Sequence, residues 1–186
     1  MFGQPEFHKI VGHKILLTGL PGCGKTTLIK RAVDRLNVKI YGFFTREIKE
    51  KGRRVGFRIE TFSKPQKNGV LSHVDIKSEY RVGKYGVDIE GFERIAIPEL
   101  SAGMKQGSLI AIDEIGKMEL FSDKFRDIIK QIFKSEINIL ATIYYKHHPF
   151  CDKLKNNPGV DLITVNKDNR DELVEWIVQV LTIRSS

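Results

Sequence analysis

Short runs of apolar residues alternate with stretches of helical period along almost the whole chain. A continuous apolar run is typical of a strand buried on both faces, while apolar residues three or four positions apart mark one face of a helix. The runs that predict buried strands are 14–18 (KILLT), 108–113 (SLIAID), 137–142 (INILAT) and 160–165 (VDLITV). A polar crossover containing proline separates the last two, and we expect it to be irregular.

Three of these strands precede segments with an apolar face, which predict helices. The expected buried residues are Leu28, Ile29, Ala32, Val33 and Leu36 in the first helix, Phe121, Phe125, Ile128, Ile129 and Ile132 in a later one, and Leu173, Trp176, Ile177, Val180 and Leu181 in the last, which begins at about Asp168.

A second pattern occupies the chain between the first two buried strands. Residues 40–47 (IYGFFTRE) and 55–62 (VGFRIETF) predict strands, and Lys51-Gly52 between them is typical of a hairpin turn. Residues 63–79 are polar and predict a loop with room for one short strand. Residues 80–87 (YRVGKYGV) predict a strand interrupted by glycines, followed by a helix to about Ala102.

Repeated strand–helix units predict the fold class. We expect an α/β fold with a mostly parallel central sheet, helices on both faces and an added antiparallel hairpin. The chain has 186 residues, of which 41% are hydrophobic and 29% charged, as in one globular domain. We assign that domain to residues 14–186. Residues 1–13 form an N-terminal extension, which is an extra strand, a disordered lead or a cloning remnant.

Composition narrows the setting and the partners. No run of 18 apolar residues is present, so we expect no membrane span, and the start of the chain lacks the apolar segment of a signal peptide. With only Cys23 and Cys151 we expect no disulfide framework and a cytoplasmic protein. The net charge of +8 favours an anionic partner. Because acidic residues alternate with the basic ones, binding of nucleic acid is not expected, although it is not excluded. We expect a monomer.

The strongest motif is GLPGCGKT at residues 19–26, which matches G-x-x-x-x-G-K-[ST] between a buried strand and an amphipathic helix. Its glycines allow backbone N–H groups to converge on phosphate oxygens at the start of the helix. Lys25 is expected to reach the β- and γ-phosphates, and Thr26 to bind Mg²⁺. The alternative is a glycine-rich loop without a ligand. The predicted nucleotide-binding residues here are Gly19, Leu20, Pro21, Gly22, Cys23, Gly24, Lys25, Thr26 and Thr27.

An acidic pair completes the motif. Asp113 and Glu114 follow an apolar run, so a buried strand delivers both carboxylates at its carboxyl end. Asp113 is expected to hold Mg²⁺ through a water, and Glu114 to activate a water for attack on the γ-phosphate. Glu114 as a cap of the next turn, or paired with Lys117, is the alternative. Thr142 ends another buried strand, and its hydroxyl is expected near the γ-phosphate if the two strands are neighbours.

Longer stretches resemble a known family. GLPGCGKTTLIKR, GFFTREI, GRRVGFRIET, YRVGKYGVD, IDEIGKMELFS and NKDNRDEL are similar to segments of the nucleoside-triphosphatase family of thermophilic prokaryotes, which includes the human cancer-related nucleoside-triphosphatase. The resemblance covers residues 14–177 and implies a RecA-like P-loop NTPase fold. It also implies slow, Mg²⁺-dependent hydrolysis of ATP, GTP and other triphosphates with loose base preference. Residues 1–13 depart from the family, whose members begin close to the first strand.

The same stretches suggest further site residues. Arg46, at the end of its predicted strand, is a candidate for stabilising transition-state charge, or else forms a strand-end salt bridge. Lys117 is a second candidate for stabilising transition-state charge, or else it pairs with Glu114. Asn166, Asn169 and Arg170 follow the last strand, where ligands of open α/β sheets bind, and are candidates for contacts with the base. The alternative is that Asn166 or Asp168 is a plain helix N-cap.

Three functions remain at this stage. Hydrolysis of nucleoside triphosphates is favoured, because Glu114 suits activation of water. A nucleoside or nucleotide kinase would need an acceptor site, at 80–88 or 144–157, and no arginine-rich lid is visible. A nucleotide-switched binding protein, associated with RNA through the basic charge, is the third.

Overall fold

The computed structural model describes residues 12–106 and 109–182. The predicted extension therefore lies almost entirely outside the described residues, as does Ser108 of the second predicted buried strand. In chain order the elements are β1 (Lys14–Thr18), α1 (Lys25–Arg35), β2 (Ile40–Glu50), β3 (Arg53–Thr61), β4 (Asn68–His73), β5 (Arg81–Val82), β6 (Tyr85–Val87), α2 (Ile89–Gln106), β7 (Leu109–Ile115), η1 (Glu119–Phe121), α3 (Asp123–Lys134), β8 (Ile139–Ile143), α4 (Pro149–Lys155), β9 (Asp161–Thr164) and α5 (Arg170–Thr182).

One nine-stranded sheet runs through the molecule in the order β5-β6-β4-β3-β2-β7-β8-β1-β9. The pairings from β2 to β9 are parallel, and those from β2 to β5 are antiparallel. The predicted α/β class with a parallel core is thus confirmed, and the antiparallel addition is larger than a hairpin. β8 separates β1, before the glycine-rich loop, from β7, which carries the acidic pair, as in a RecA-like sheet.

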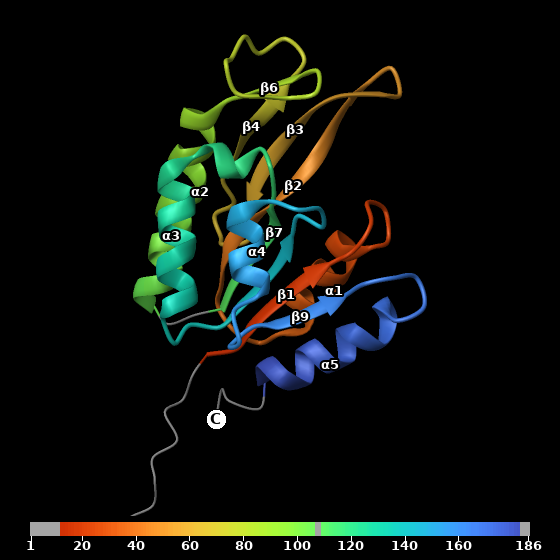
Figure 1. Cartoon of the computed structure of the whole chain (residues 1–186), viewed down its shortest axis with the longest axis vertical. Coiled ribbons are helices and arrows are strands. Elements are labelled where there is room, and N and C mark those ends of the chain that lie inside the picture. The colour runs from red at the N-terminus through yellow and green to blue at the C-terminus, as the bar shows by residue number, and fades with distance from the viewer. Residues whose placement is uncertain (1–11, 107–108, 183–186) are drawn as a thin grey trace, which may run out of the picture.

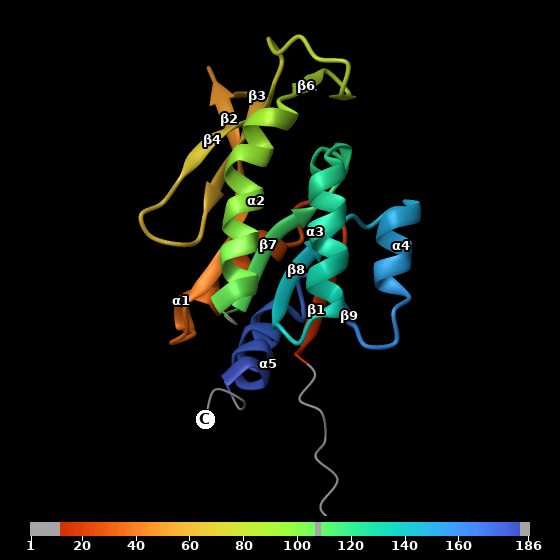
Figure 2. The ribbon, with the colours of Figure 1, turned by 90° about the vertical axis from the view of Figure 1, so that its left-hand side faces the viewer.

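Helices cover the two faces of the parallel part (Figure 1). On one face α1 and α5 pack together, and their apolar residues share a core with β1. On the other face α2 and α3 lie in front of the sheet in Figure 2. There the ring of Phe43 on β2 contacts Phe92 and Phe125, with centroids 5.4 and 5.9 Å apart. Among the described helices, none is long and apolar enough to cross a membrane.

Two local predictions were incomplete. Residues 80–87 form two short strands, β5 and β6, because Gly83 takes a φ of 59° and turns the chain between them. The polar crossover contains a helix, α4, that the sequence pattern did not predict. Pro149 occupies its first turn, where the missing N–H costs nothing, and His148 accepts a hydrogen bond from the Phe150 N–H as its cap.

The last helix was assigned one wrong core residue. Trp176 is 37% exposed, whereas Val174, Ile177 and Leu181 of α5 are buried. These three define a single stripe at helical spacing, and Trp176 lies beside that stripe. Among the described residues α5 packs against α1 through this stripe, which is narrower than the apolar face that the sequence predicted.

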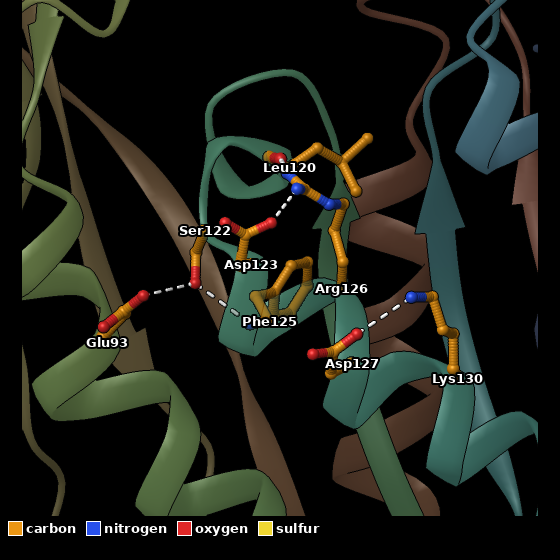
Figure 3. A network of polar contacts seen from close by, with 8 residues as sticks. All are labelled: Glu93, Leu120, Ser122, Asp123, Phe125, Arg126, Asp127 and Lys130. Atoms are coloured by element: carbon orange, nitrogen blue, oxygen red, sulfur yellow. Dashed lines mark hydrogen bonds and ion pairs between the residues drawn. The ribbon is translucent and has the colours of Figure 1, made fainter.

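A polar network fixes the chain just after the acidic pair (Figure 3). The Ser122 hydroxyl accepts a hydrogen bond from the Phe125 N–H (3.0 Å), which caps α3, and donates one to Glu93 on α2 (2.7 Å). Arg126 binds the Leu120 carbonyl. Ser122 therefore begins the helix, and Phe121 lies before it in η1 instead of in the predicted helix. This network anchors the segment that follows β7 to two helices.

Candidate active site

The loop between β1 and α1 has the backbone shape that its glycines predict. Gly19, Gly22 and Gly24 have φ values of 146°, 79° and 107°, which L-residues rarely adopt. A Cβ at Gly19 would come 2.5 Å from the Val165 carbonyl oxygen, and one at Gly24 would come 3.0 Å from the Arg170 side chain. The loop therefore requires glycine for its conformation and for its packing against the loop that follows β9.

The start of α1 is suited to an anion. No side chain caps its N-terminus and no acid occupies its first turn, so backbone N–H groups stay available for phosphate oxygens. Lys25 opens the helix, and its Nζ donates to the carbonyl oxygens of Gly19 (2.8 Å) and Leu20 (3.1 Å). The ammonium thus lies within the curve of the loop. Thr26 and Thr27 are exposed beside it, and Cys23 is buried below it.

Asp113 and Thr142 meet on neighbouring strands. β8 pairs with both β7 and β1, and Thr142 is the register partner of Leu17, next to the glycine-rich loop. The Thr142 hydroxyl donates to Asp113 Oδ1 at 2.6 Å, and both side chains are buried. The two strands are neighbours, as the expectation for Thr142 required. In this structure its hydroxyl is bound to the carboxylate of Asp113.

Glu114 lies where the pairing of β7 with β8 is interrupted, between Ile112 and Ile115. Burial raises the pKa of its carboxyl, the negative charge of Asp113 raises it further, and the nearby Lys25 ammonium lowers it. Asp113 and Lys25 are therefore close enough to act on the carboxyl of Glu114. A carboxylate with a raised pKa is a stronger base than an exposed glutamate.

A buried glutamate, Glu119, adjoins the partly buried Glu114, and sequence reasoning missed it. Glu119 is 5% exposed, and burial, followed by the charge of Glu114, raises its pKa to about 8. A Cβ added at Gly116 would lie 2.7 Å from Glu114 Oε1 and 2.9 Å from Glu119 Oε2. Gly116 therefore gives both carboxyl groups their space. The sequence feature that could have indicated it is an acidic residue between Met118 and Leu120, shortly after the acidic pair.

Arg46 and Lys117 have partners other than a nucleotide in this structure. β2 continues to Glu50, so Arg46 is not at a strand end, and its Nε lies 3.4 Å from Glu60 Oε2. The Nζ of Lys117 lies over the Tyr144 ring, 5.3 Å from its centroid. Within the described residues Lys117 makes no ion pair with Glu114. Arg46 therefore forms a salt bridge within the sheet, and Lys117 contacts an aromatic ring.

The loop after β9 uses its own amide groups. The Asn166 side chain accepts hydrogen bonds from the N–H groups of Asp168 and Asn169 at 2.8 and 2.9 Å. The Asn169 amide accepts from the Asn166 N–H and donates to the Thr164 carbonyl, each at 2.9 Å. Both asparagines thus stabilise the loop that leads into α5. Arg170 lies against Gly24 and lines a small cavity with Thr27.

A larger cavity of about 660 Å³ opens between the glycine-rich loop and the loop after β9. It is lined by residues 18–23, residues 164–167 and Tyr145. Tyr145 follows β8 at the carboxyl edge of the sheet and is 36% exposed. Sequence reasoning did not select it, although its place after a buried strand was the available signal.

The donor groups fit magnesium. Asp113 supplies a carboxylate and Thr26 a hydroxyl, both hard oxygen ligands of the kind that Mg²⁺ takes together with phosphate oxygens and waters. The described residues contain no group of three or more His, Cys, Asp or Glu side chains that would hold a metal alone. This is expected of a site where the metal arrives with phosphates. The hydrogen bond from Thr142 fixes one oxygen of the Asp113 carboxylate.

A glycine-rich loop that leads into a helix, and an acidic pair on a strand separated from β1 by β8, together define a P-loop nucleotide-binding protein. The family model described as NTPase matches residues 14–178, and the chain belongs to this family. The predicted family resemblance is therefore confirmed.

Curated relatives support this membership. The chain is 44% identical over 168 residues to "Nucleoside-triphosphatase THEP1" of Thermotoga petrophila, covering 90% of this chain and 92% of the relative. It is 40% identical over 181 residues to "Cancer-related nucleoside-triphosphatase" of Homo sapiens, covering 88% and 94%.

Solved structures agree in fold. The crystal structure of THEP1 from Aquifex aeolicus superposes with a TM-score of 0.83 at 42% identity, covering 91% of this chain and 99% of that one. The solution structure of a human cancer-related nucleoside triphosphatase gives 0.78 at 36% identity, covering 94% and 100%. The similarity thus extends over the whole described domain.

Proposed function

We propose that this protein hydrolyses nucleoside triphosphates to diphosphates and inorganic phosphate, with magnesium. The observation that carries the proposal is the position of Glu114, a carboxylate of raised pKa next to Asp113 and close to Lys25. The names of its relatives, nucleoside-triphosphatases at 44% and 40% identity, support the same reaction.

The loop and α1 would hold the triphosphate. Backbone N–H groups between Gly22 and Thr26 would bind the β- and γ-phosphates, and the Lys25 ammonium would leave the carbonyls of Gly19 and Leu20 to contact them. Thr26 and Asp113 would hold Mg²⁺, which when bound neutralises charge that develops on the phosphate oxygens. Thr142 keeps the Asp113 carboxylate oriented through its hydrogen bond.

Glu114 would act as the base. It accepts a proton from a water whose oxygen attacks the γ-phosphorus, while the bond to the bridging oxygen breaks and the diphosphate leaves. Arg46 and Lys117 remain proposed as groups that stabilise the transition state. Each would have to leave its partner in this structure, Glu60 or the Tyr144 ring.

We also propose loose selectivity for the base, and the hydrogen bonds within the loop after β9 support it. The amides of Asn166 and Asn169 are engaged within that loop, so few groups there can read the edge of a base. The base would instead contact side chains such as Arg170 or Tyr145, which offer flat surfaces to any base.

Phosphate release from ATP and GTP tests the proposal, with and without Mg²⁺ and with Lys25→Ala as the control. Release that needs magnesium and is lost in the control supports hydrolysis. The same assay with nucleosides and nucleoside monophosphates added examines the kinase alternative. If little phosphate appears until one acceptor is present, and that acceptor becomes phosphorylated, the proposed hydrolase is wrong.

A further inference from the structure

Several charged side chains lie on one face of the sheet beside Asp113. Register partners on adjacent strands point to the same face, as do residues two apart on one strand. Phe44 is the register partner of both Asp113 and Glu60, and Arg46 is the register partner of Arg58. All five side chains therefore share a face. On the opposite face α2 packs against β2, β3 and β4 (Figure 2).

Three cations meet on this face, and we name Lys30, Arg46 and Arg58 the basic cluster. Lys30 reaches it from α1, with its Nζ 4.0 Å from the centroid of the Phe44 ring. The guanidinium of Arg46 lies over the same ring, with its Cζ 5.2 Å from the centroid. One aromatic ring thus holds two positive charges close to Asp113.

The two arginines of the basic cluster share one carboxylate. Glu60 Oε2 lies 3.4 Å from Arg46 Nε, and Glu60 Oε1 lies 3.9 Å from Arg58 Nε. The arginine side chains are 56% and 48% exposed, so their remaining N–H groups are accessible. Lys30 has no ion pair among the described residues; burial and then Arg46 lower its pKa, while the charges of Asp113, Glu60 and Asp34 raise it. Among the described residues Glu60 alone pairs with Arg46 and Arg58, so two exposed guanidinium groups share one carboxylate and keep N–H donors for an anion.

A hollow of about 670 Å³ begins at Arg58 and extends over β2, β3 and β4. Its apolar lining is Ile48, Val70 and Ile76, and Val70 is 41% exposed although it lies in the middle of a strand. The carboxylate of Glu47 at its edge is engaged by Arg54 (2.8 Å) and Lys49 (3.2 Å). The volume lies within the range of small-molecule sites.

We propose that this face binds a phosphate monoester, with its dianion on the basic cluster and its organic body in the hollow. Arginine suits this ligand, because its planar fork of donors matches phosphate oxygens. The apolar lining suits a flat or apolar body, and nucleoside monophosphates belong to this class. The proposal extends the proposed function, because it places a second phosphate-bearing molecule beside the triphosphate site.

The experiment measures binding to protein whose glycine-rich loop is saturated with Mg²⁺ and a fluorescent ADP. Fluorescence first establishes that the loop is filled, so failure of the proposed nucleotide site is seen separately. AMP, GMP, phenyl phosphate and inorganic phosphate are then titrated by calorimetry. Arg58→Ala is the test variant, and Arg53→Ala, an exposed arginine of the same hairpin outside the cluster, is the matched control.

We expect at least one monoester to bind with one-to-one stoichiometry, more tightly than inorganic phosphate, without releasing the fluorescent ADP. Arg58→Ala should weaken this binding about tenfold or more, as for loss of one charged hydrogen-bonding group, and Arg53→Ala should leave it unchanged. Phosphate release should be unchanged in Arg58→Ala. Absence of saturable binding by the monoesters, equal weakening in both variants, or binding of a single-stranded oligonucleotide in their place overturns the proposal.

Discussion

The hydroxyl of Thr142 donates a hydrogen bond to Asp113 Oδ1 at 2.6 Å, and it does so from a position with no solvent exposure. A buried carboxylate that is oriented by a neighbouring strand needs no rearrangement before it binds a metal. Because β8 lies between β7 and β1, this contact joins the acidic pair to the strand that pairs with β1, which leads into the glycine-rich loop.

Thr142→Val should lower both the stability of the fold and the apparent affinity for magnesium. Valine has the same shape but cannot donate, so the buried carboxylate loses a partner and the free energy of unfolding should fall by about 1–3 kcal/mol. The apparent affinity for Mg²⁺ in the phosphate-release assay should fall as well. Thr142→Ser, which keeps the hydroxyl, is the control and should retain most of that affinity. Equal magnesium dependence in the two variants would contradict the role given to this bond.

Glu114→Gln should lose turnover and keep nucleotide binding. The amide preserves the shape of the side chain but cannot accept the proton of water, and loss of a general base typically lowers kcat about 10²- to 10⁴-fold. Single-turnover phosphate release and binding of a fluorescent triphosphate measure the two properties. If turnover survives intact, Glu114 is not the base.

Glu119 should make stability depend on pH. Its folded pKa of about 8 lies above the ordinary value of 4.5, so the unfolded carboxyl ionises first as pH rises. Unfolding then releases a proton, and the free energy of unfolding should fall between these two pH values, by at most about 1.4 kcal/mol per pH unit. Urea unfolding of Glu119→Gln across this window should show a flatter profile than the parent protein.

The exposed acid Glu136 offers the control for that series, because Glu136→Gln should leave the profile unchanged. An identical slope in Glu119→Gln and the parent protein would show that another group is responsible.

Gly116→Ala should disturb both glutamates at once. A methyl group there would meet Glu114 Oε1 at 2.7 Å and Glu119 Oε2 at 2.9 Å, closer than real Cβ contacts. We expect a loss of about 1–3 kcal/mol in the free energy of unfolding, as for overpacking, with a lower kcat. Gly159→Ala is the matched control, since its methyl group would lie 3.5 Å from Asn157 Oδ1, an ordinary contact. Full activity in Gly116→Ala would show that Glu114 tolerates displacement.

The glycine-rich loop, the acidic pair and the parallel core were all predictable, because each depends on a local pattern. Arg46 shows where such reasoning ended. Its hairpin was predicted, but its contact with Glu60 depends on the register of β2 with β3, which the sequence pattern did not specify. The asparagines after β9 show the same limit, because their amides are used by neighbouring backbone groups.

By itself, the sequence determined which segments become strands and which loop can hold phosphate, since alternation, glycine content and short motifs act over a few residues. Only the tertiary structure decided that β8 lies between β1 and β7, so that Thr142 meets Asp113, and that Glu119 turns back beside Glu114. Those contacts join residues that are distant along the chain or separated by a turn. They arise because the parallel pairing of β7, β8 and β1 brings the carboxyl ends of these strands to one edge of the sheet.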